Sequence, residues 1–536
     1  MNKLTLICIS LALVCLAVSC KKDPDPGAKE PLLVNKTFIS LQGHTGHIDS
    51  LAIQYPGNWT ISKDPTASWL NVGSMSGSGN ITIYVSTAQS NTSNTTRTAT
   101  VTITPDGDDT RRVTITVIQN TLERIVWKRI LGGSLYEIMN VILPTPEGGY
   151  ITAGYTESVD GDITGNHGGS DVWVVKMDAF GGIIWKKAYG GTENEQAHAM
   201  IPANDGGYII VGSARSKNGD VTNHRLYEDV WILKIDGNGN LLWQKTYGGQ
   251  GTDVAHSIIS TPDNGYLVGG QTDSRDGDVT GLHFDPNFLG ATDDVWLLKI
   301  DISGNLIWQK CYGGNWNEAA HSITRTPDGG FLATGYSDAT TNSGDVQATQ
   351  GSHDFWAFKT DANGNLLWQK TYGGSKSDIA RKVLSLADGY IMTGSTESKD
   401  GQVTNNHGTT DAWVVKIDLT GNLVWQKAFG GTWNEHARHI ARDGNDFLLS
   451  ADAASNDGDL VGNTDSDATW FIKIDANGNK IWSRTFGGTD DDNGANWIVV
   501  NPDNSYTCTA TSTSKNGDVL PGNHGLYDAW VFTFRY

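Results

Sequence analysis

The sequence predicts an all-β protein, with a small β-sandwich followed by a closed seven-bladed β-propeller of four-stranded blades. Three observations support this fold class. The 536 residues include 64 Gly and 19 Trp, and only 18% are charged, which is typical of strands joined by tight turns. Runs that alternate apolar and polar residues precede residue 121, and one Trp-containing pattern recurs after it.

The recurring pattern contains a hairpin with one Trp on each strand. The Trp of the second hairpin strand returns every 57 to 65 residues. A period of this length predicts stacked units of supersecondary structure, and four strands per unit predict propeller blades. We expect both Trp of each hairpin to lie in the core between blades. The seven Trp of the second strand are Trp127, Trp185, Trp243, Trp308, Trp368, Trp425 and Trp482.

The two ends of the repeat region complement each other. The region 121–536 opens with a single outer strand at 125–130 and ends on a third strand at 529–534. Pairing of these two strands would complete the last blade and leave no free sheet edge. We therefore expect seven blades in a closed ring.

The chain begins with an export signal. Residues 1–19 contain one Lys and an apolar run that is too short for a stable membrane span, and Ser19-Cys20 follows the run. This segment resembles a bacterial lipoprotein signal, which implies cleavage before Cys20 and a diacylglycerol on its thiol. The protein would then be exported across the inner membrane and lipid-anchored at the outer membrane or cell surface. An ordinary signal peptide with a chance Cys is the alternative.

Residues 20–30 are polar and broken by prolines, as in a tether, and residues 31–120 alternate apolar and polar residues in several runs. Within 31–120, Trp59-Thr60-Ile61, Ser68-Trp69-Leu70 and Gly77-Ser78-Gly79-Asn80 resemble the BACON domain, a Bacteroidetes-associated carbohydrate-binding module that is often N-terminal. The resemblance implies either sugar binding or a spacer between the membrane and a functional domain, and we favour the spacer. We expect Trp59 and Trp69 to be core residues.

Charge and motifs exclude several functions. The chain has 39 Lys and Arg against 59 Asp and Glu, a formal net charge of −20, so its surface should repel nucleic acid. Cys311 and Cys508 lie in different repeats, so no disulfide framework is expected. No nucleophile elbow, phosphate loop or zinc pattern occurs, and we predict no catalytic residues and no metal ligands.

An acidic loop follows the second strand of nearly every repeat, for example Asp160-Gly161-Asp162. Such carboxylates could wrap Ca²⁺, but Asx-turns account for the same residues. Because the loop recurs, we expect it to fold the blade, and we predict no cofactor, with Ca²⁺ as the alternative. The loop histidines are expected to brace it through hydrogen bonds. They are His167, His224, His353, His407 and His524.

The start of the first strand of each repeat carries the candidate site. An acid stands four residues after a Gly pair, and a polar or basic residue stands three further on. In a propeller these residues would surround the channel mouth, either as hydrogen bonds between blades or as a ligand site. Two repeats also place a Trp just before the acid, where it could stack on sugar rings. The candidate ligand-binding residues are Trp316, Trp433, Glu195, His198, His256, Glu318, His321, Arg381, Glu435 and Arg438.

These inferences combine into one expected function. We expect a membrane-anchored, extracytoplasmic binding lipoprotein whose propeller presents a site for a glycan or polysaccharide on a spacer domain. One alternative is a propeller enzyme, a hydrolase or lyase that acts on polysaccharide. The other is a structural platform for protein partners.

Overall fold

The computed structural model describes residues 30–41, 46, 48–89, 91, 96–120, 125–284, 292–460, 463, 467–519 and 523–536. The chain divides into two compact units, Met1–Arg124 and Ile125–Tyr536. In the described ranges the helices are two short 3-10 turns, Asp109–Arg111 and Gly458–Leu460, and all other regular structure is strand. The all-β prediction is therefore confirmed.

The predicted signal peptide, Cys20 and most of the tether lie outside the described residues. In the part of the chain that is described, no helix has the length and apolar character that a membrane span needs.

The N-terminal unit consists of two sheets that share one apolar core. Trp59 and Trp69 are 1% and 6% exposed within this core, as predicted. In spatial order, the first sheet contains β1 (Leu33–Val34), β3 (Ile48–Gln54), β7 (Ile81–Thr87) and β5 (Leu70–Val72). The second contains β2 (Phe38–Leu41), β9 (Val113–Gln119), β8 (Arg97–Pro105), β4 (Asn58–Lys63) and β6 (Ser76–Ser78).

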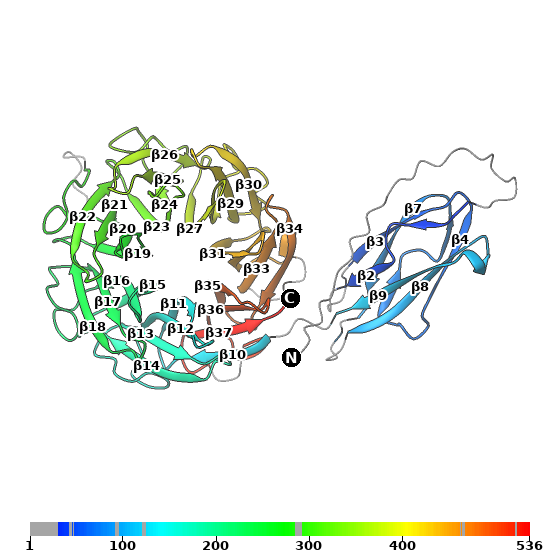
Figure 1. Cartoon of the computed structure of the whole chain (residues 1–536), viewed down its shortest axis with the longest axis horizontal. Helices are drawn as coiled ribbons and strands as arrows, with labels where there is room; N and C mark the ends of the chain where they lie inside the picture. The colour runs from blue at the N-terminus through cyan, green and yellow to red at the C-terminus, as the bar shows by residue number, and fades with distance from the viewer. Residues whose placement is uncertain are drawn as a thin grey trace, which may run out of the picture. The chain divides into compact units, whose positions relative to one another are not determined.

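The described residues of the C-terminal unit form seven four-stranded antiparallel sheets, which are arranged around a common centre (Figure 1). We number the sheets 1 to 7 in chain order of their first strands. Sheet 1 contains β11 (Glu137–Pro144), β12 (Tyr150–Thr156), β13 (Asp171–Met177) and β14 (Ile183–Tyr189). Sheet 2 contains β15 (Glu195–Pro202), β16 (Tyr208–Ala214), β17 (Asp229–Ile235) and β18 (Leu241–Tyr247). Sheet 3 contains β19 (Asp253–Ser260), β20 (Tyr266–Thr272), β21 (Asp294–Ile300) and β22 (Leu306–Tyr312).

The remaining sheets repeat this order. Sheet 4 contains β23 (Glu318–Arg325), β24 (Phe331–Ser337), β25 (Asp354–Thr360) and β26 (Leu366–Tyr372). Sheet 5 contains β27 (Asp378–Leu386), β28 (Gly389–Thr396), β29 (Asp411–Asp418) and β30 (Leu423–Phe429). Sheet 6 contains β31 (Glu435–Asp443), β32 (Asp446–Ala453), β33 (Ala468–Ile474) and β34 (Lys480–Phe486). Sheet 7 contains β35 (Asp492–Val500), β36 (Tyr506–Ser512), β37 (Asp528–Phe534) and β10 (Ile125–Leu131).

The first strand of the unit completes its last sheet. β10 pairs antiparallel with β37, from Ile125 opposite Phe534 to Leu131 opposite Ala529. The first strands of successive sheets contact one another, and β11 contacts both β15 and β35. The predicted pairing of the two ends is confirmed, and it leaves no unpaired edge on β37.

The hairpin tryptophans divide into two classes. Those of the first hairpin strand, such as Trp173 and Trp231, are fully buried. Those of the second strand, such as Trp185, are mostly half-buried and pack against the cores between sheets, so the expected core position is confirmed in full for the first class and in part for the second. The physical reason is that each half-buried ring covers a turn of the next sheet. The Trp185 indole donates to the carbonyl oxygen of Gly237 at 3.2 Å.

This contact requires a glycine in the covered turn. Gly239 has a φ of +75°, and a Cβ there would lie 2.9 Å from the Trp185 ring. The Tyr189 hydroxyl also donates to the Gly239 carbonyl oxygen at 2.6 Å. Backbone conformation and packing thus both exclude a side chain at this position.

We predict that Gly239→Ala lowers the free energy of unfolding by about 1–2 kcal/mol or more, because Ala would occupy the left-handed region and contact Trp185. Gly237→Ala is the matched control, since no atom lies within 4 Å of a Cβ at Gly237. Urea denaturation of both variants measures the difference. Equal stability of the two variants would contradict the proposed role of this turn.

Candidate ligand-binding site

Each first strand of the seven described sheets is interrupted by a β-bulge or irregularity at the predicted polar position. In β15, for example, Ala197 and Ala199 pair with successive residues of β16 and leave His198 unpaired. A bulge changes the direction in which its extra side chain points. The bulged residues are Asn140, His198, His256, His321, Arg381 and Arg438, and the wider irregularity of β35 contains Asn496.

These seven residues line one cavity of about 280 Å³, which we call the central cavity. It is built from all seven first strands, and its apolar lining includes Met200, Ile259 and Ile323. The structure therefore brings together five of the predicted site residues, which are His198, His256, His321, Arg381 and Arg438.

Three histidines stand side by side in the central cavity. The ring centroids of His198 and His256 are 5.3 Å apart, and those of His256 and His321 are 5.5 Å apart. Burial, with a contribution from His256, lowers the pKa of His198 to about 3. Burial also lowers the pKa of His256 to about 4, and that of His321 falls well below its usual value for the same reason. Near neutral pH these rings are uncharged and can donate and accept hydrogen bonds.

Two arginines in the central cavity differ in their partners. Arg438 donates from Nε and Nη2 to the two carboxylate oxygens of Asp452, at 2.7 Å each. Arg381, on the neighbouring sheet, forms neither a hydrogen bond nor an ion pair with any described residue, and Asp452 and Tyr336 act on it only electrostatically. Its guanidinium therefore keeps its donors for another group.

Three cavity residues were not predicted from the sequence. Lys382, His439 and Trp497 each follow a bulge or irregularity by one residue and also line the cavity. The Lys382 ammonium lies 4.0 Å from the Trp497 ring centroid, and the ring centroids of His439 and Trp497 are 4.4 Å apart. Burial lowers the pKa of Lys382 to about 8. The available signal was that these large residues replace small ones such as Ala199 and Ser257 at the same position of other repeats.

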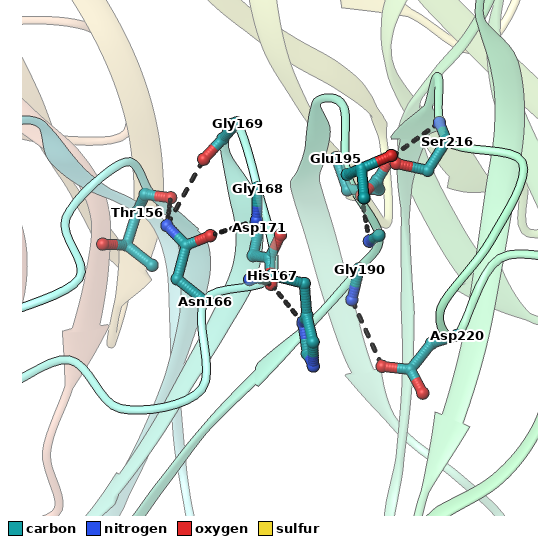
Figure 2. Close-up of polar contacts among 12 residues, drawn as sticks. Thr156, Asn166, His167, Gly168, Gly169, Asp171, Gly190, Glu195, Ser216 and Asp220 are labelled. Atoms are coloured by element: carbon teal, nitrogen blue, oxygen red, sulfur yellow. Dashed lines mark hydrogen bonds and ion pairs between the residues drawn. The ribbon is translucent and has the colours of Figure 1, made fainter.

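The predicted acids do not face the cavity. Glu195, Glu318 and Glu435 are fully buried. Each accepts the N–H of the second glycine of its Gly pair, at 2.7, 2.8 and 2.8 Å, and Figure 2 shows the further bond from the Ser216 N–H to Glu195. Buried carboxylates need such partners in place of water. Of the two alternatives from the sequence, the contacts agree with hydrogen bonding within the framework of the sheets.

The acidic loops are held by local hydrogen bonds. His167 Nδ1 lies 2.6 Å from an Asp171 carboxylate oxygen, and the Asn166 side chain holds the neighbouring loop backbone (Figure 2). His407, His524 and His283 contact an aspartate in the same way, whereas His224 contacts Tyr227 and His353 contacts Ser377. Within the described ranges, no three His, Cys, Asp or Glu side chains form a group that could hold a metal ion. The expectation of no cofactor stays a prediction.

The two predicted rim tryptophans lie apart from the central cavity. Trp316 and Trp433 are 37% and 61% exposed, and neither lines the cavity. Each stands two residues before the buried acid that begins its strand. Their proposed stacking on sugars stays a prediction.

Two further cavities adjoin the central cavity beside sheets 1 and 7, and we call this pair the side trough. At its outer end, the rings of Tyr136 and Tyr527 are 5.7 Å apart and inclined by 15°. They line a cavity of about 340 Å³ together with Tyr155 and Glu157. A cavity of about 300 Å³ shares Tyr155 with this outer one and shares His198 and Arg438 with the central cavity. The three cavities therefore lie next to one another, with the tyrosines at one end of the row and the cationic residues of the central cavity at the other.

The structure thus defines a β-rich repeat protein with a ligand-sized polar cavity among its first strands. Residues 58–120 match the family model BACON, described as "Putative binding domain, N-terminal". This match confirms the predicted BACON domain over a shorter range than 31–120.

Two further comparisons concern larger parts of the chain. A stretch of 229 residues is 26% identical to the regulatory protein FlaEY of Caulobacter vibrioides and covers 40% of this chain and 23% of that protein. An apocarotenoid oxygenase structure from Synechocystis is 14% identical, with a TM-score of 0.35, and the match covers 72% of this chain and 84% of the other.

A Bacteroides ovatus GH5 xyloglucanase structure is 18% identical, with a TM-score of 0.16, over 22% of this chain and 29% of the other. These TM-scores are too low for either structure to support an inference about function.

The buried histidines predict a specific pH dependence. His256 has an ordinary pKa of about 6.5 in the unfolded chain, whereas burial lowers its pKa to about 4 in the folded chain. This residue therefore costs stability as the pH falls from about 6.5 to about 4. We predict that His256→Asn, which places there the residue found at Asn140 and Asn496, reduces the loss of melting temperature between pH 7 and pH 5.

Burial raises the pKa of carboxyl groups such as Asp253 to about 6, so these groups add stability as the pH falls. The wild type and His256→Asn both contain them. Comparison of the two melting curves at each pH therefore isolates the histidine. Parallel curves across this range would show that His256 is protonated equally in the folded and unfolded chains.

Proposed function

We propose that this chain is a membrane-anchored, extracytoplasmic binding lipoprotein. Its seven sheets form a closed β-propeller that binds a glycan in the central cavity, and the BACON unit separates the propeller from the membrane. The observation that carries the proposal is the set of seven bulges, because strands from every sheet direct side chains into one space. The residues there differ between sheets, unlike the framework residues, so the fold does not require their identities.

The pairing of the chain ends supports the closed ring. β10 completes sheet 7, and the first strands of sheets 7 and 1 are in contact. Closure gives the central cavity a continuous wall, which a ligand site on the axis needs.

The lining of the cavity favours binding over hydrolysis. Most glycoside hydrolases use two carboxyl groups on either side of the scissile bond, but Glu195, Glu318 and Glu435 are buried and hydrogen-bonded within the framework. Asp452, the carboxylate beside Arg438, is held in a bidentate ion pair. A binding site needs only the donors, acceptors and apolar surface that the cavity offers.

A polysaccharide lyase is a second candidate. The observation in its favour is that uncharged imidazoles lie near the Arg381 side chain, since a neutral His can abstract a proton while a cation stabilises the charge that develops. A turnover assay on every glycan that binds separates the two candidates. Formation of an unsaturated product by the wild type, and not by His256→Asn, would favour the lyase.

The binding proposal is tested with a soluble chain that lacks residues 1–30. A glycan array identifies ligands, and calorimetry then compares variants. We predict that His198→Ala weakens binding roughly tenfold through loss of one hydrogen bond and its ring contact. Trp316→Ala and Trp433→Ala should weaken it if the rim also contacts sugar, whereas Trp185→Ala should lower the melting temperature and leave the affinity of the folded protein unchanged.

An unchanged affinity in His198→Ala would place the ligand outside the central cavity. Absence of any glycan ligand would favour the protein-contact platform.

The anchor is tested separately. We predict that Cys20→Ala abolishes incorporation of a radiolabelled fatty acid and releases the protein from membranes, because the thiol is the proposed acceptor of the lipid. Ser19→Ala keeps a small residue at the cleavage position and serves as the control. Labelling that survives Cys20→Ala would overturn the lipoprotein assignment.

A further inference from the structure

The charge of the central cavity is opposite to that of the whole chain. The chain has a net charge of −20, yet Arg381, Lys382 and Arg438 all line this cavity. Asp452 forms an ion pair with Arg438 and also acts electrostatically on Arg381, so three cations share this one carboxylate. A local excess of positive charge within an acidic protein is a specific feature and does not follow from composition.

The three cations are not equivalent. Arg438 already donates two hydrogen bonds to Asp452, and the Lys382 ammonium lies over the Trp497 ring. Arg381 has no such partner in the described part of the chain. A guanidinium presents a planar set of donors that matches a carboxylate or sulfate. Arg381 is thus the group in the cavity that is best able to receive an anion.

The far end of the side trough is aromatic and acidic, whereas the central cavity is cationic. Tyr136, Tyr155 and Tyr527 supply aromatic surface, and Glu157 places a carboxyl group beside them. Aromatic rings suit the apolar faces of sugars, whereas Glu157 would repel an anion there. An extended ligand would therefore bind in one direction, with its anionic part at Arg381 and its neutral part at the tyrosines.

We propose that the central cavity binds an acidic sugar of an oligosaccharide, with its carboxylate or sulfate on Arg381, and that neutral sugars of the same chain extend along the side trough to Tyr136 and Tyr527. The inference rests on the proposed glycan-binding function and specifies its ligand class. The acidic exterior opposes densely charged polyanions, so the preferred glycan carries isolated charges.

The test uses two pairs of probes that differ only in charge. One pair is a glucuronate-terminated trisaccharide and the same trisaccharide with its carboxyl group reduced to the alcohol. The other is a sulfated trisaccharide and its desulfated form. Titration calorimetry on the full soluble chain gives the affinities, and the pair with the larger difference identifies the anion. Preference for the charged member of at least one pair supports the inference, and equal affinities within both pairs overturn it.

The matched variants are Arg381→Gln and Arg325→Gln. Both remove one positive charge, but Arg325 is exposed and does not line the cavity. We expect Arg381→Gln to lose roughly tenfold or more in affinity for the charged probe and to lose much less for the neutral probe. Arg325→Gln should leave both affinities unchanged. Arg381→Lys, which keeps the charge without the fork of donors, should lie between, and melting curves confirm that each variant is folded.

Three other outcomes distinguish the acidic-sugar inference from the proposed glycan-binding function. If His198→Ala weakens binding of the neutral probe and Arg381→Gln alters no affinity, the glycan function stands and the acidic-sugar inference is wrong. If inorganic sulfate binds as tightly as the sulfated probe, the sugar part of the inference is wrong. If no saccharide binds, both the inference and the proposed function fail.

The direction of binding is tested with Tyr136→Ala, which should lower the affinity for the trisaccharides but not for free glucuronate. An equal loss of affinity for both would overturn the proposed direction.

Discussion

The seven-sheet unit depends on the way a buried carboxylate holds the glycine pair before each first strand. In sheet 2, Glu195 accepts the N–H of Gly191 at 2.7 Å, and a Cβ on Gly190 would lie 2.6 Å from carboxylate oxygens of both Asp171 and Glu195. The turn is thus closed by charge-assisted hydrogen bonds and admits no side chain. It sets where each first strand begins, and therefore where its bulge and cavity residue lie.

Much of the fold could be predicted because its determinants recur. The Trp spacing and strand phase predicted the pairing of β10 with β37, since every repeat needs the same neighbours. Burial of Glu195 and partial exposure of Trp185 could not be predicted, because both depend on which turn of another strand covers the residue. His198 and Arg381 were found as polar residues at one register, whereas Lys382 was missed because a bulge lets two consecutive residues reach one side of a strand.

The bulges also place the cavity residues at positions outside the pairing of the strands. Residues that repeat in every sheet, such as the buried Trp231 and its equivalents, form the cores. The bulged residue takes no part in the pairing of the first two strands, so it can be Asn in sheet 1, His in sheet 2 and Arg in sheet 5. The same framework can therefore hold different ligand sites without a change in its hydrogen bonds.

The pairing of β10 with β37 has a consequence for the order of folding. Its first paired residues, Ile125 and Phe534, are 409 positions apart, whereas the other sheets pair strands that are close in sequence. Closing so long a loop costs more conformational entropy than local pairing and is slow. Six sheets can therefore form before residues 528–534 have been synthesised, whereas sheet 7 can be completed only after them. Until then β10 has no partner strand, and loss of the β10–β37 pairing in the folded unit would free both ends of the chain segment 125–534.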